Sequence, residues 1–344
     1  ASYRVLSVME ELADYQPDLF VIYTGHNEFL ERRTYGDLLD QPEFLKEARA
    51  SAFRLRTTSL LRRVASVAKG DRGKPIVLGG EVQRIPIDAV GREAYHRDDA
   101  LKEKVVRHFE ISLNRMADIA QDCGAKLVLV SPASNFRDAQ PFKSEAGGGV
   151  AAALASEWQA EFAKAQLALQ DEDAGTALRH LERCVAIDPR HAKSQYLLGR
   201  ALWGEGRCDE ARGAFANAIE EDICPLRAIA ATVAAVKDTA AERDVPLVDL
   251  QTVLDSAAEH GVTGADFFHD HLHFTVDANR ILALEIIEQM AGRGWLEAHW
   301  PERTAEDVAA ELESQIDRPR YAEELCKLSF AMDTFGQERM ALYN

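Results

Sequence analysis

The sequence predicts an α/β protein whose doubly wound, three-layer sheet domain is interrupted by an all-helical insertion. Short, continuously apolar runs alternate with amphipathic segments of helical spacing, which is typical of a parallel sheet covered by helices. In the middle of the chain this alternation gives way to an internal repeat of 34 residues. We therefore predict a discontinuous sheet domain over 1–150 and 226–292, a helical insertion over 155–225, and a helical C-terminal extension over 293–344.

Composition narrows the classes of partner. The 344-residue chain carries a formal net charge of -17, so its field repels phosphate backbones and anionic lipid surfaces, and we expect no nucleic acid partner. Its five cysteines are scattered, which argues against a disulfide framework and a zinc site. We find no membrane segment and no signal peptide, so the sequence predicts no compartment. No cofactor and no metal are expected.

Three apolar runs predict buried parallel strands, and helical patterns flank them. The strands are expected at 18–23, 126–130 and 245–250, and the helices at 3–12, 101–119, 227–243 and 276–290. Gly124 is expected to stop the second helix. A basic segment at 45–67 is expected to be helical, and the Gly-rich stretch 70–80 to be a loop.

The insertion contains two copies of one pattern, with small residues where helices would cross and large ones where they would interlock. The matching pairs are Ala165 and Gly199, Ala168 and Leu202, Ala177 and Ala211, Leu181 and Phe215, and Cys184 and Ala218. This pattern resembles the tetratricopeptide repeat (TPR). The resemblance implies a concave face that binds a peptide or protein partner. The alternative is that the two copies only pack on the domain they interrupt.

The first motif of interest, Thr24-Gly25-His26-Asn27-Glu28, follows the first predicted strand. Polar groups at the carboxyl ends of parallel strands are where open sheets bind ligands. Asn27 can direct an amide N–H into such a cleft, as an oxyanion hole requires. In the alternative, Gly25 supplies backbone freedom for a turn and Asn27 caps the next helix. We expect His26 to face solvent, with contact to substrate as the alternative.

The second motif lies in the stretch 267–274, the densest cluster of titratable groups in the chain. Asp270 and His273 have the Asp-x-x-His spacing, by which one tight turn can present an imidazole and the carboxylate that fixes its tautomer. The alternative is a pair that merely stabilises the turn. His269 and His271 are expected to be structural or rim residues, not ligands. A shared metal ion is disfavoured, because in an extended run these histidines would face away from Asp270.

Together, Gly25-His26-Asn27-Glu28 and Asp270-His271-Leu272-His273 resemble the third and fifth sequence blocks of the SGNH hydrolases, also called the GDSL-type esterases, and in particular members that carry TPR repeats. The resemblance implies a flavodoxin-like sheet that here lacks its first strand. It also implies that Asn27 donates to an oxyanion, with Gly25, His26 and Glu28 nearby, that Asp270 is the orienting acid, and that His273 is the general base.

The nucleophile of that family, the serine of a Gly-Asp-Ser block, has no counterpart in the chain. We expect it upstream of Ala1 and leave the nucleophile unassigned; Ser2, Ser7 and Ser131 are not convincing substitutes. The implied activity is hydrolysis of a small ester, such as an acetylated carbohydrate, or transfer of its acyl group, and the chain alone is expected to be inactive. The alternative function is a non-catalytic TPR scaffold on a degenerate hydrolase fold.

Overall fold

The computed structural model describes residues 1–29, 95–148, 150, 152–296, 304–334 and 336–337. These residues belong to one compact unit. The helix expected at 45–67 and the loop expected at 70–80 lie outside the described residues.

Among the described residues, the sheet has three parallel strands in the order β1 (Leu19–Tyr23), β2 (Lys126–Val130) and β3 (Leu247–Val248). The first two strands match their predictions closely. The third is shorter than predicted, because Asp249 is already the N-cap residue of helix α11 (Leu250–Ala257). All three strands end at the same edge, as the carboxyl ends of parallel neighbours must.

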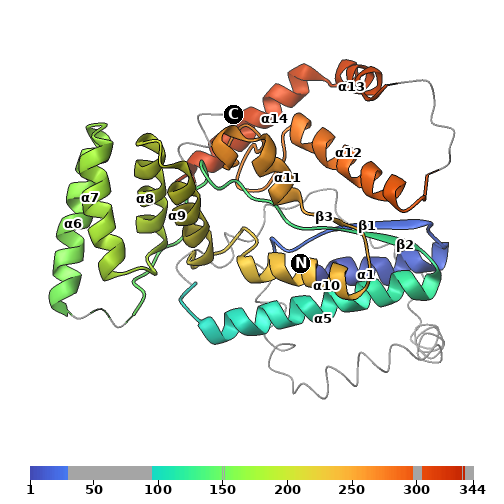
Figure 1. Ribbon diagram of the computed structural model, residues 1–344, viewed down its shortest axis with the longest axis horizontal. Coiled ribbons are helices and arrows are strands. Elements are labelled where there is room, and N and C mark those ends of the chain that lie inside the picture. The colour runs from blue at the N-terminus through green and yellow to red at the C-terminus, as the bar shows by residue number, and fades with distance from the viewer. Residues whose placement is uncertain (30–94, 149, 151, 297–303, 335, 338–344) are drawn as a thin grey trace, which may run out of the picture. The chain divides into compact units, whose positions relative to one another are not determined.

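Helices cover both faces of this sheet, as predicted (Figure 1). On one face lie α1 (Ser2–Leu12), α5 (Asp99–Cys123) and α10 (Ala230–Glu242), and on the other lie α11 and α12 (Val276–Gly292). Alternate residues of β2 serve the two cores: Leu127 and Leu129 pack with α5, whereas Val128 and Val130 pack with α11. This alternation is why the strand is apolar throughout. Gly124 ends α5 in the left-handed conformation, with φ of 78°, as expected.

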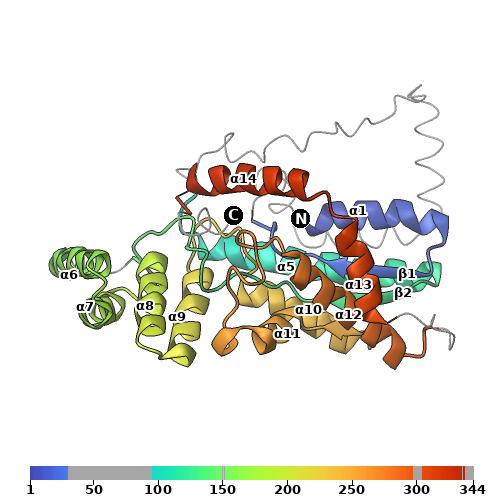
Figure 2. The same ribbon diagram turned by 90° about the horizontal axis from the view of Figure 1, so that it is seen from above.

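The insertion consists of four helices, α6 (Ala152–Gln170), α7 (Ala174–Ile187), α8 (Ala192–Gly204) and α9 (Cys208–Glu220), each packed on the next (Figure 2). The repeat pattern explains the packing. A Cβ added at Gly199 would lie 2.7 Å from the ring of Phe215, so only glycine lets α8 and α9 approach this closely. The prediction of two interlocking helix pairs is confirmed.

The two ends of the insertion are held together. Asp222, which is buried, accepts hydrogen bonds from the backbone N–H groups of Phe142 (2.8 Å), Lys143 (3.0 Å) and Cys224 (3.0 Å). The N–H of Ile223 also donates to the carbonyl oxygen of Lys143, at 2.9 Å. The chain therefore leaves the sheet region and returns to it at one place.

Four further elements complete the described fold. They are the 3-10 helices η1 (Ala13–Tyr15) and η3 (Glu259–Gly261) and the helices α13 (Ala305–Ser314) and α14 (Arg318–Thr334). Helices thus dominate the described part of the C-terminal extension. Within the described ranges, no helix has both the length and the apolar character that crossing a bilayer requires.

Candidate functional site

The stretch from Phe268 to Phe274 is a closed turn. Its ends form an antiparallel bridge, and the N–H of His269 donates to the carbonyl oxygen of His273 at 2.8 Å. We predicted an extended run here, with the histidines facing away from Asp270, and that prediction is therefore wrong. No group of three or more His, Cys, Asp or Glu side chains in the described ranges is placed to hold a metal ion.

Asp270 and His273 form the hydrogen-bonded pair that their spacing predicts. Asp270 Oδ2 lies 2.6 Å from His273 Nδ1, and Oδ1 accepts from the N–H groups of Leu272 (2.8 Å) and His273 (2.7 Å). The carboxylate is 2% exposed, whereas the His273 side chain is 69% exposed. Since an ionised carboxylate can only accept, His273 donates from Nδ1, and Nε2 is the ring atom available to take a proton.

The charges of this pair support each other. Burial by itself would raise the pKa of Asp270, but the hydrogen bond from His273 and the nearby His271 outweigh it and hold the pKa well below its ordinary range. The hydrogen bond to Asp270 raises the pKa of His273, against a smaller opposing effect of burial. Asp270 thus remains an anion that stabilises a protonated His273.

The loop after β1 requires its glycine. Gly25 has a φ of 131°, and a Cβ there would lie 3.1 Å from Pro132 Cγ. Asn27 is exposed on this loop. Glu28 is buried and accepts from the backbone N–H (2.9 Å) and the hydroxyl (2.8 Å) of Ser2, so it anchors the start of α1 to the loop.

His26 does not face solvent as expected, because the segment after α9 covers it. It is 5% exposed, and its Nδ1 accepts from the N–H of Ala228 at 3.0 Å. That contact places the ring proton on Nε2, which lies 2.9 Å from the Tyr23 hydroxyl. Burial, together with the positive potential of His271 and His273, lowers the pKa of His26 to about 3.

Loops from distant parts of the chain converge at this edge of the sheet. His26 lies within electrostatic range of Asp270, His271 and His273, and the rings of Tyr23 and Phe274 are 5.6 Å apart. Ser131, at the end of β2, is buried and donates its hydroxyl to Asp249 at 3.1 Å. It is therefore engaged with a different carboxylate from the one that holds His273.

Two buried residues that the sequence did not single out support this convergence. Asn135 donates its side-chain amide to the carbonyl oxygen of Asp270 at 3.2 Å. Arg227, 2% exposed, donates Nη1 to the carbonyl oxygens of Asn135 (2.8 Å) and Ala139 (2.9 Å). Asn135 lies in the polar loop that directly follows β2, which is a signal that could have found it, whereas a lone arginine after the repeats gives no signal.

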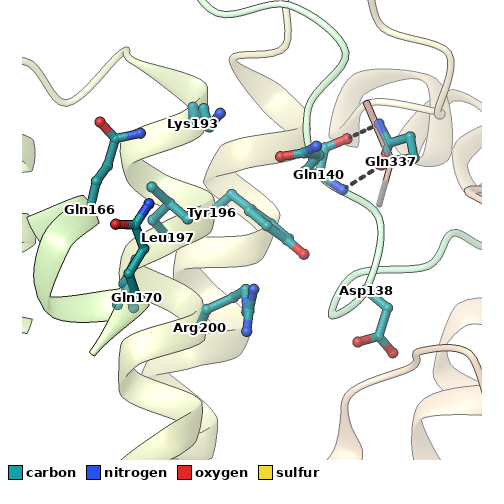
Figure 3. A pocket seen from close by; sticks show the side chains of 10 residues that line it. Asp138, Gln140, Gln166, Gln170, Lys193, Tyr196, Leu197, Arg200 and Gln337 are labelled. Carbon is teal, nitrogen blue, oxygen red and sulfur yellow. Dashed lines mark hydrogen bonds between the residues drawn. The ribbon is translucent and has the colours of Figure 1, made fainter. Parts of the chain in front are cut away.

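A second feature is a groove of about 250 Å³ beside the repeat helices (Figure 3). Three residues of α8 at helical spacing, Lys193, Tyr196 and Arg200, lie along one side of it (Figure 3). The remaining lining residues are Gln166, Leu169 and Gln170 of α6, Leu197 of α8, Asp138 and Gln140 from the segment after β2, and Gln337. The groove is therefore polar, rich in amides, and shared between the repeats and the sheet region.

The described unit is thus a small parallel sheet covered by helices and joined to a two-repeat helical insertion. Residues 168–222 match the tetratricopeptide repeat family, in agreement with the resemblance seen in the sequence. This match fits a protein-interaction role, since such repeats commonly bind other proteins. No curated protein and no solved structure matches the chain. The resemblance to SGNH hydrolases therefore rests on the two motifs alone.

Proposed function

We propose that the repeat helices bind an extended, acidic segment of a partner protein in the groove beside α8. The observation that carries this proposal is the row of Lys193, Tyr196 and Arg200 on a helix that matches a tetratricopeptide repeat. The groove is lined by two cations, Lys193 and Arg200, and one carboxylate, Asp138, so its local charge favours an acidic occupant although the whole chain is acidic. The side-chain amides of Gln166 and Gln170 can pair with the backbone of an extended peptide.

A random peptide library displayed on phage tests this proposal. Clones are selected on the whole chain, and their dissociation constants are compared with those for the double variant Lys193→Glu, Arg200→Glu. Selected peptides should be acidic, and the variant should weaken their binding about tenfold or more, because opposed like charges cost several kcal/mol. The double variant Arg179→Glu, Arg183→Glu on α7 is the matched control, since it changes the net charge equally, both arginines are exposed, and neither lines the groove.

The control should leave binding unchanged. Selection of neutral peptides that bind both charge variants equally would contradict the proposed groove, as would a failure to enrich any sequence.

The second candidate function is ester hydrolysis or acyl transfer by an SGNH-type mechanism, and the Asp270–His273 pair is the observation that favours it. A buried carboxylate that orients an exposed imidazole is the base half of a Ser-His-Asp site. In this proposal His273 takes the proton of a serine as that serine attacks a small ester. Asp270 stabilises the imidazolium, and Asn27 donates to the oxyanion. The nucleophile remains unassigned.

Hydrolysis of p-nitrophenyl acetate by the protein expressed from its complete gene tests this candidate. His273→Ala should lower the rate about 100- to 10,000-fold, the usual contribution of a positioned base. His96→Ala is the control, because His96 is also exposed, at 74%, and also holds a carboxylate through Nδ1, that of Glu145 at 2.9 Å. Equal activity of the two variants would exclude His273 as the base, and loss of activity on chelation would indicate a metal-dependent hydrolase.

A further inference from the structure

One short segment lies between the groove and the Asp270–His273 pair. It runs from Asn135 to Gln140, directly after the loop that ends β2. Asp138 and Gln140 line the groove, as Figure 3 shows, whereas Asn135 contacts the turn that carries the pair. A displacement of a residue on one side of this segment can therefore be transmitted directly to the other side.

Asn135 is completely buried and uses both ends of its side-chain amide. Nδ2 donates to the carbonyl oxygen of Asp270 (3.2 Å), and Oδ1 accepts from the N–H of Asp138 (2.9 Å). Its own N–H donates to the carbonyl oxygen of His271 at 3.1 Å. One side chain thus connects the backbone under the pair to a residue of the groove wall.

On the side of the groove, the segment is held by helix α8 of the repeats and by the chain that follows the repeats. The hydroxyl of Tyr196, on α8, donates to the carbonyl oxygen of Arg137 at 3.2 Å. Arg227 donates hydrogen bonds to the carbonyl oxygens of Asn135 and Ala139 and lies within electrostatic range of Tyr196. Because these groups are buried and close-packed, a shift of Tyr196 cannot be absorbed without moving the segment.

We propose that Asn135 is a positioning residue for the Asp270–His273 pair and couples that pair to the acidic peptide segment in the groove. The inference rests on the two proposed functions, since it takes both the groove and the pair as working sites. When the peptide packs on Tyr196, the backbone from Arg137 to Asn135 shifts. The amide of Asn135 then moves relative to Asp270, and the hydrogen bond between Asp270 and His273 lengthens or shortens.

The titration of His273 reports this coupling, because its hydrogen bond to Asp270 is what raises its pKa. The groups that face the pair are His271 on the same turn and His26 from the loop after β1, and Arg227 acts in turn on these two histidines. Loss of the Asn135 amide frees the Asp270 backbone and weakens the bond to His273. The pKa of His273 should then fall toward that of an ordinary imidazole.

The experiment follows the His273 imidazole of the whole chain by NMR across pH in the wild type and three variants. Asn135→Ala removes the link. Ser134→Ala is its matched control, because Ser134 is the neighbouring residue, is also buried, and makes its hydrogen bonds in this network through its backbone N–H and carbonyl groups. Tyr196→Phe removes only the hydroxyl on the groove side and keeps the ring, which lies 5.7 Å from that of Phe215.

We expect Asn135→Ala to lower the pKa of His273, Tyr196→Phe to shift it measurably, and Ser134→Ala to leave it unchanged. If Asn135→Ala does not fold, Tyr196→Phe alone decides. An unshifted titration in folded Tyr196→Phe would overturn the coupling, and an unshifted titration in folded Asn135→Ala would overturn the positioning role. The measurement needs neither a bound partner nor turnover, so its failure is distinguishable from failure of either proposed function.

Discussion

Replacement of His26 by asparagine should make the protein less sensitive to mild acid. His26 is held neutral in the fold, between the N–H of Ala228 and the hydroxyl of Tyr23, and its pKa is lowered to about 3. In the unfolded chain the same imidazole titrates near its ordinary value of about 6.5. Between these two values the unfolded state binds more protons than the native state, so stability falls as pH falls.

The size of this effect follows from the two pKa values. Between pH 7 and pH 5, a histidine whose pKa moves from about 6.5 unfolded to about 3 folded removes about 2 kcal/mol from the free energy of unfolding. His271, whose pKa burial lowers to about 4, should add a similar amount. His26→Asn keeps an oxygen in reach of the Ala228 N–H but cannot titrate, so only its share should disappear.

Urea unfolding at pH 7 and pH 5, followed by circular dichroism, measures both proteins. The wild type should lose about 2 kcal/mol more than His26→Asn between these pH values. The comparison concerns the change with pH, so any constant cost of the substitution at pH 7 cancels. If the two proteins lose the same free energy, His26 is not buried and neutral in the native state, and the covering role of the segment after α9 is refuted.

Further predictions concern the packing, each measured by thermal or urea unfolding. Gly199→Ala should destabilise the repeats by about 1–3 kcal/mol because its Cβ would meet Phe215 at 2.7 Å. Gly213→Ala, on α9 with nothing within 4 Å, should instead stabilise by about 0.5–1 kcal/mol. Gly25→Ala should cost about 1–3 kcal/mol through its φ of 131°. Arg227→Met should cost about 1–3 kcal/mol for each carbonyl oxygen left unpaired. If the two changes Gly199→Ala and Gly213→Ala shift the free energy of unfolding in the same direction, the close approach of α8 and α9 does not explain the glycine.

The sequence predicts the layers of the fold because their cause is local. Each strand is apolar on both faces, and Leu127, Val128 and Leu129 show why: neighbouring residues enter different cores. The repeat is also predictable from the sequence, since Gly199 must be small and Phe215 large for the helices to interlock. The predicted β3 is too long because helix α11 already begins at Leu250, directly after Asp249, whose carboxylate is bound by the side chains of Lys237 and Thr252.

The site was predictable only where its contacts are short in sequence. Asp270 reaches His273 within one turn, and its spacing reveals the pair. Asn135 meets Asp270 across 135 residues, and Arg227 meets Asn135 across 92 residues, so no spacing rule could reveal them. The prediction that His26 faces solvent is wrong for the same reason, because Ala228, which is distant in the sequence, covers it.

The junction at Lys143 and Asp222 has a consequence for how such a chain can be rearranged. The Asp222 carboxylate accepts from the N–H of Lys143, and the N–H of Ile223 donates to the carbonyl oxygen of Lys143, so the intervening helices begin and end at one place. Chains can lengthen or shorten most easily where the flanking ends already meet. Extra helix pairs could therefore be spliced in, or the existing ones excised behind a short bridge, while the strands on either side kept their register.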